Sequence, residues 1–159
     1  MDRVLHDIER LYHRDLPRFV RLAHAVIGDR SLAEEAVHDA FASAIRARAS
    51  FRGDGPLDAW LWRAVVNAAR RVVRDAGPLP VDADPDALVD PPSAQLESLS
   101  PLVAQLPERQ RLVVFLRYYA DLDYRAIAGV LGVTVGTVSA SLAAAHSNLR
   151  SALEATAHG

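Results

Sequence analysis

The chain has 159 residues, half of them hydrophobic, with a net charge of −2 and no cysteine. This length allows one domain or two small ones, and the absence of cysteine excludes disulfides and cysteine-ligated metal sites. A strongly basic, stand-alone nucleic-acid binder is also disfavoured. No apolar run approaches the roughly 20 residues that span a bilayer, and no leader pattern is present, so we expect a cytoplasmic protein without direct membrane insertion.

The first half of the chain shows helical periodicity. A helix is expected over residues 3–27, with a break or kink near Asp15 because Pro17 lies within it. Gly28 and Asp29 end this helix. Ser31, followed three residues later by Glu34, matches a capping box and predicts a second helix to about residue 48.

Residues 51–56, FRGDGP, have the composition of a loop, and a third helix is expected over residues 57–74. Trp60 and Trp62 cannot share one helix face, so their roles should differ. Trp60 falls at a core spacing, whereas Trp62 is open to either a packing or a surface role. The expected core positions are Trp60, Leu61, Ala64, Val65 and Ala68.

Residues 76–95 hold five of the nine prolines and four aspartates, and no arginine. Such a segment buries too little apolar surface to order itself, which predicts a flexible acidic linker. The domains are therefore expected at residues 1–75 and 96–159. Residues 1–75 carry 13 Arg against 11 Asp and Glu, so cations are concentrated in the first domain.

The second domain should begin with a helix over residues 96–105, followed by another that starts at Pro107. Asp121 and Asp123 are expected to form a turn and an N-cap. Residues 124–149 read as a helix-turn-helix around Gly132, with Ala128 at the close approach of the two helices. The inward positions of these helices are expected to be Leu112, Val113, Leu116, Tyr119, Val138, Leu142, Ala145 and Leu149. The chain is thus predicted to be all-α.

The order of these motifs resembles the extracytoplasmic-function (ECF) sigma factors of RNA polymerase. Residues 29–45 resemble the helix that docks on the polymerase clamp, and residues 51–74 resemble the loop and helix that open and read the −10 promoter element. Residues 106–150 resemble the domain that binds the −35 element and the polymerase flap. A lone helix-turn-helix is weak evidence, but three blocks in this order around a Pro/Asp linker are specific.

The resemblance implies core RNA polymerase, promoter DNA and an anti-sigma factor as partners. It implies no catalysis, cofactor, metal or small-molecule substrate, and the six histidines have no metal-ligand spacing. The residues expected at the polymerase are Glu34, Glu35, His38, Asp39 and Phe41. Those expected at DNA in the first domain are Phe51, Arg52, Asp54, Trp62, Arg63, Asn67, Arg70, Arg71 and Arg74. Those expected at DNA in the second domain are Arg125, Thr134, Thr137, Ser139, Ala140, Ser141, Ala143 and Arg150.

The second helix of the helix-turn-helix departs from the family pattern. Positions that are usually basic carry other residues here, namely Ser139, Ser141, Ala144, His146 and Asn148. Each lost phosphate contact weakens binding and lowers its salt dependence. The −35 contact is therefore expected to be weak, or this helix packs against a protein instead.

Three functions remain open on the sequence alone. The preferred one is a working sigma factor, and the first alternative is a sigma-like interaction or regulatory protein whose C-terminal domain has lost DNA binding. The second alternative is a helix-turn-helix repressor that acts without polymerase, which the charge balance disfavours. The apolar second helix also leaves self-association open.

Overall fold

The computed structural model describes residues 2–76 and 101–157, and every regular element in these two ranges is a helix. The chain divides into two compact units, Met1–Ala87 and Leu88–Gly159. The predicted all-α, two-domain fold is confirmed. The predicted linker lies outside the described residues except for Ala76, which is the last residue of a helix.

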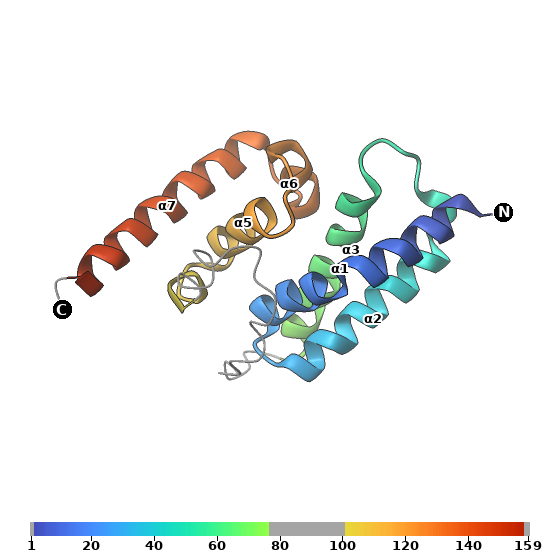
Figure 1. The fold of residues 1–159 in the computed structure, drawn as a ribbon, viewed down its shortest axis with the longest axis horizontal. Helices are drawn as coiled ribbons and strands as arrows, with labels where there is room; N and C mark the ends of the chain where they lie inside the picture. The colour runs from blue at the N-terminus through green and yellow to red at the C-terminus, as the bar shows by residue number, and fades with distance from the viewer. Residues whose placement is uncertain (1, 77–100, 158–159) are drawn as a thin grey trace. The chain divides into compact units, whose positions relative to one another are not determined.

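The N-terminal unit is a bundle of three helices, each in contact with the other two (Figure 1). They are α1 (Arg3–Ile27), α2 (Arg30–Arg46) and α3 (Leu57–Ala76), and a 3-10 turn, η1 (Arg48–Ser50), follows α2. Each helix has an apolar stripe that points inward. Phe19 of α1 is the centre of the core, because its ring contacts Phe41 of α2 and Trp62 of α3.

Of the break or kink expected near Asp15, the break is wrong, because helix α1 passes through Pro17 as one continuous helix. Proline removes one backbone hydrogen bond and crowds the preceding turn, which alone would favour a break. Here Asp15 and Phe19, on either side of Pro17, are both buried, while Pro17 itself is exposed. Packing on both sides of the proline holds the helix together.

The start of α2 also differs from the prediction. Asp29 is the N-cap, and its Oδ1 accepts a hydrogen bond from the Leu32 N–H at 2.9 Å. Ser31 lies inside the helix and is exposed, so the predicted capping box at Ser31 is wrong. An aspartate is among the best N-caps and is available two residues earlier. Helix α2 ends at Arg46, two residues before the predicted end, because the chain tightens into η1.

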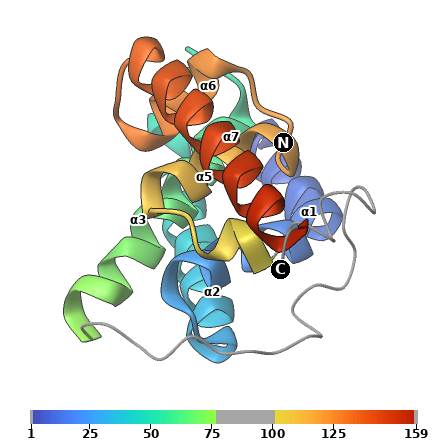
Figure 2. The same ribbon diagram turned by 90° about the vertical axis from the view of Figure 1, so that its left-hand side faces the viewer.

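The C-terminal unit contains a helical turn at residues 101–104 and three longer helices (Figure 2). These are α5 (Glu108–Tyr118), α6 (Tyr124–Leu131) and α7 (Val135–Ala157). Pro107 is the N-cap of α5 and not its first helical residue. All eight predicted inward positions are buried, and α7 buries Val138, Leu142, Ala145 and Leu149, as expected from their spacing.

The turn between α6 and α7 is that of a helix-turn-helix. Gly132 has φ 69° in the left-handed region and donates its N–H to the Ala128 carbonyl, which ends α6. Ala128 is buried beneath this turn. Asp123 caps the start of α6 through the Ala126 N–H at 2.8 Å, as predicted. The directions of α6 and α7 differ by 101°, so α7 presents a separate outward face.

Candidate nucleic-acid interface

The connection between α2 and α3 is an exposed loop, and the aromatic side chains on its two sides contact each other. Arg52, Gly53 and Asp54 are exposed, and Gly53 has φ 76°, a conformation that favours glycine. The ring of Phe51 lies 5.4 Å from that of Trp60 in α3, with 49° between their planes. Phe51, at the start of the loop, therefore contacts Trp60 in the first turn of α3.

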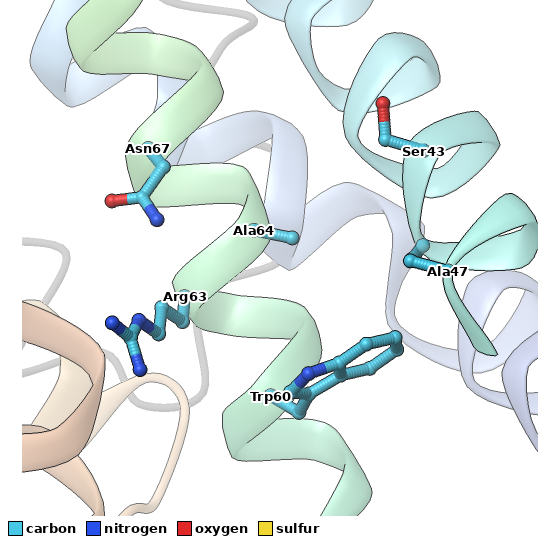
Figure 3. Close-up of a pocket in the computed structure, with 7 residues that line it drawn as sticks. Ser43, Ala47, Trp60, Arg63, Ala64 and Asn67 are labelled. Atoms are coloured by element: carbon cyan, nitrogen blue, oxygen red, sulfur yellow. The ribbon is translucent and has the colours of Figure 1, made fainter. Parts of the chain in front are cut away.

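A pocket of about 250 Å³ lies between α2 and α3 next to this pair (Figure 3). The Trp60 ring extends from α3 toward Ala47 of α2, whereas Arg63 and Asn67, which also line the pocket, extend from the other side of α3. The remaining lining residues are Ser43, Ala44 and Ala64. The pocket thus combines a flat aromatic wall and small apolar side chains with a cation and an amide. That is the chemistry that holds an unstacked base.

The cationic residues of α3 form one stripe that continues from the pocket. At about 100° per residue, Arg63, Asn67, Arg70, Arg71 and Arg74 fall within roughly a third of the helix circumference, together with Trp60. All five are exposed except Arg70, which is half-buried. The acids of this helix, Asp58 and Asp75, lie at its two ends. Four guanidinium groups on one face, with an aromatic ring at one end, suit a nucleic-acid backbone.

Trp62 does not belong to this interface, and its predicted contact with DNA is wrong. Its side chain is 2% exposed and its ring lies 4.1 Å from that of Phe19, inside the helical bundle. Trp60, predicted as core, is the half-buried ring beside the pocket. The signal was present in the sequence, because the inward positions of α3 come in adjacent pairs at residues 61–62, 65–66 and 68–69. Trp62 fits that stripe and Trp60 does not.

The outward face of α2 carries most of the residues expected at the polymerase. Glu34, Glu35, His38 and Asp39 are all exposed. Glu34 pairs with Arg30 at 3.3 Å, and His38 Nε2 lies 3.1 Å from the Tyr12 hydroxyl of α1.

Phe41, by contrast, is 4% exposed and packs edge-on against Tyr12 and Phe19. The predicted contact of Phe41 with polymerase is therefore wrong. Its position in α2 follows the buried stripe of Val37 and Ala44, one helical turn on either side. Phe41 is a core residue that supports the exposed face.

In the C-terminal unit, the residues expected at DNA lie on accessible surface. Ser141 and Thr137 are half-buried, and the others are exposed. Thr134 caps α7, since its Oγ1 accepts from the Thr137 N–H at 3.1 Å and lies 2.9 Å from the Thr137 hydroxyl. The cations Arg125 and Arg150 lie before and after the outward face of α7, which between them carries Ser, Ala and His but no Arg. The outward face of α7 is therefore accessible but poor in positive charge.

Two polar side chains of α7, those of His146 and Asn148, are engaged with α5. His146 Nε2 lies 2.9 Å from the Tyr118 hydroxyl, and the Asn148 side-chain amide donates to Gln110 Oε1 at 2.8 Å. These contacts are within the C-terminal unit. The His146 and Asn148 side chains therefore brace α7 against α5.

Within the two described ranges, no group of three His, Asp or Glu side chains is arranged to hold a metal ion. In the same ranges, no single helix is both long and apolar enough to cross a membrane. The pair α6 and α7 passes that test only when taken together across its bend.

Comparisons with known proteins agree with this arrangement. The family model "Sigma-70 region 2" matches residues 11–78, and "Sigma-70, region 4" matches residues 96–149. RNA polymerase sigma-H factor of Pseudomonas aeruginosa is 30% identical over 161 residues, which cover 89% of this chain and 81% of that protein. ECF RNA polymerase sigma factor SigM of Mycobacterium tuberculosis is 34% identical over 144 residues, covering 88% and 72%.

Two solved structures share the fold. CnrH, in complex with the cytosolic domain of CnrY, superposes with a TM-score of 0.71 at 23% identity and covers 95% of this chain and 90% of its own. The sigma factor RpoE of Bartonella quintana, in complex with the anti-sigma factor NepR, gives 0.74 at 22% identity, covering 93% and 97%. Sigma factors are not enzymes, and the two matched regions span both helical units. The chain belongs to the ECF sigma factors, the transcription initiation subunits of RNA polymerase.

Proposed function

We propose that this chain binds core RNA polymerase, directs it to a set of promoters and opens the −10 element with its N-terminal unit. One observation carries the proposal, namely that the arginine stripe of α3 leads directly into the pocket beside Trp60. Strand opening requires a site for an unstacked base next to cations that hold the backbone. Phe51 contacts Trp60 at this site, and Arg52 and Asp54 are proposed to reach the DNA from the exposed loop.

The exposed face of α2 is the proposed contact with polymerase. Glu34, Glu35 and Asp39 give it negative charge, and His38 lies between them. A complementary basic surface would be attracted to this face, which favours rapid and correctly oriented docking. The proposed activity needs no catalytic group, cofactor or metal on this chain, because the polymerase forms the RNA. A protein with this activity would work in the cytoplasm, where the polymerase and the DNA are.

The C-terminal unit is proposed to rest on the −35 element through α7 and its flanking arginines. Serine hydroxyls and alanine methyl groups can contact phosphates and thymine methyl groups, but they release no counterions. Each unit alone would then bind DNA modestly. A tether between the domain limits at about residues 75 and 96 would raise the effective concentration of one unit at its site once the other is bound.

An anti-sigma factor is the proposed inhibitor. The support is that two proteins of the same fold, CnrH and RpoE, were solved with a bound partner, which in the case of RpoE is named an anti-sigma factor. Binding of such a protein would compete with polymerase or DNA for the surfaces described above.

A second function is favoured by the charge-poor face of α7 and by the engagement of His146 and Asn148 with α5. These features support a sigma-like protein that binds polymerase or a regulator but has lost the −35 contact. Run-off transcription distinguishes the two functions. Core polymerase and the full chain are incubated with fragmented DNA from the source genome, and the transcripts are sequenced. Discrete starts above core polymerase alone support the sigma factor, whereas polymerase binding without such starts supports the alternative.

A further inference from the structure

Arg48 joins three parts of the N-terminal unit at the base of the loop that precedes α3. Its Nε donates to Asp2 Oδ2 at the start of α1, and its Nη1 donates to the Ile45 carbonyl in the last turn of α2 at 2.6 Å. Both side chains of the Arg48–Asp2 pair are only partly exposed, at 36% and 40%. A guanidinium is suited to this task because its nitrogens lie in a fixed plane and donate in different directions.

Asp2 is itself held in place from the other side. Its Oδ1 accepts from the Leu5 N–H at 3.1 Å and so caps α1. The hydrogen bonds from Arg48 and Leu5 keep the pKa of the Asp2 carboxyl below its usual value. Arg48 therefore contacts a carboxylate whose position is set by the α1 backbone.

From Arg48 the chain leads directly to the aromatic pair. The Ser50 hydroxyl donates to the Ala47 carbonyl at 2.6 Å, and the Phe51 N–H donates to the Arg48 carbonyl at 3.2 Å. These bonds fix the direction in which Phe51 leaves η1. The Phe51 ring then contacts Trp60, which lines the pocket between α2 and α3. Few other bonds restrain the loop, since Arg52 to Pro56 are exposed.

We propose that Arg48, held by Asp2, is a positioning residue for promoter opening, because its side chain fixes η1 against the start of α1 and the end of α2, and η1 leads to Phe51 at the mouth of the pocket. This inference rests on the proposed function of that pocket. Arg48 touches no base itself. Loss of the Arg48–Asp2 contact leaves the core of Phe19, Phe41 and Trp62 intact, so the helical bundle and the outward face of α2 are retained. What changes is the direction of the loop.

The test compares Arg48→Ala, Asp2→Asn and the double variant, using the full chain with core polymerase and a promoter found by run-off transcription. Asparagine keeps the N-cap of α1 but removes the carboxylate charge. Arg10→Ala is the matched control, because Arg10 also pairs with an aspartate, Asp7, at the surface of α1. The readouts are polymerase affinity, the rate of promoter opening by permanganate reactivity at saturating sigma factor, and opening on a template already mismatched across the −10 region.

We expect Arg48→Ala and Asp2→Asn each to slow opening by about three- to tenfold, and the double variant to be no slower than the slower single one. Polymerase affinity should stay within about twofold, Arg10→Ala should behave like the unmutated chain, and the mismatched template should remove the defect. Opening at the unmutated rate, an equal loss of polymerase affinity, or a defect that persists on the mismatched template would overturn the inference. Failure of the unmutated chain to open any promoter would overturn the proposed function itself.

Discussion

The Trp62 ring lies against the Phe19 ring at a centroid distance of 4.1 Å and an angle of 35°, and this contact joins α3 to α1. Trp60, two residues earlier on α3, is on a different face and lines the pocket. The two tryptophans of the chain therefore have different roles, one in stability and one at the proposed interface.

Substitution of the two tryptophans should separate these roles. Trp62→Ala removes a buried aromatic side chain and is expected to lower the free energy of unfolding by about 3–5 kcal/mol. Trp60→Ala should cost much less stability but should reduce promoter opening. Urea unfolding followed by far-UV circular dichroism measures the first effect, and permanganate reactivity of promoter thymines measures the second. Equal losses of stability in the two variants would contradict this assignment.

The arginine stripe of α3 should govern the salt dependence of DNA binding by the complex with polymerase. Arg71→Ala or Arg74→Ala removes one exposed cation. If that cation contacts a phosphate, each variant should make the fall of log K with log salt less steep, by about 0.7–0.9. Arg10→Ala, an exposed cation on α1, serves as the control and should leave the slope unchanged. The slope is measured from promoter affinity between low and moderate salt. The same slope change for all three variants would argue against a defined interface on α3.

The charge-poor face of α7 allows a test by gain of function. Ala144→Arg adds a cation at an exposed position of α7, and it should strengthen −35 binding and raise the salt slope by about 0.9. Ala155→Arg places the same charge on an exposed position near the end of α7, beyond the buried stripe. Affinity of the polymerase complex for promoters with and without the −35 element is the measurement. A similar gain for both variants would indicate only a nonspecific charge effect.

The turn of the helix-turn-helix should depend on Gly132. Gly132→Ala forces a side chain into the left-handed region and is expected to destabilise the C-terminal unit by about 1–2 kcal/mol. Gly129→Ala, in the exposed surface of α6, should instead stabilise it by about 0.5–1 kcal/mol. No neighbouring atom lies within 4 Å of an added Cβ at either glycine, so the comparison isolates the backbone conformation. Hydrogen exchange of α6 and α7 amides reports both changes, and equal effects would contradict this explanation.

The N-cap of α2 gives a direct comparison between sequence pattern and structure. Asp29→Ala should cost about 1 kcal/mol, because it removes the acceptor for the Leu32 N–H. Ser31→Ala should change stability by less than about 0.5 kcal/mol, since Ser31 is exposed within the helix. Urea unfolding followed by tryptophan fluorescence reports on this unit, which contains Trp60 and Trp62. A larger loss of stability for Ser31→Ala than for Asp29→Ala would instead support Ser31 as the helix cap.

Local pattern predicted most of the fold because each helix buries a regular apolar stripe. The four inward residues of α7 and the left-handed Gly132 follow directly from spacing and turn chemistry. The errors arose where tertiary packing or competing caps decide the outcome. Pro17 stays within a helix because both its sides are packed, and Asp29 precedes Ser31 as the stronger available cap.

The proposed site was less predictable than the fold, since it depends on which helix faces meet. Trp62 and Phe41 lie on amphipathic helices, and composition alone cannot distinguish a buried ring from an exposed one. Their contacts with Phe19 show that they are core residues. The hydrogen bonds of His146 and Asn148 with α5 join residues 28 and 38 positions apart in sequence, and no local pattern predicts them.

Permanganate probing of a promoter in the presence of core polymerase, with and without this chain, tests the proposed function most directly. We expect thymines around the −10 element to become reactive only when both proteins are present, and to be less reactive when Trp60→Ala replaces the unmutated chain. Polymerase binding without any reactive thymine, or tight binding of duplex DNA by the chain alone, would contradict the proposal that it opens promoters through its N-terminal unit.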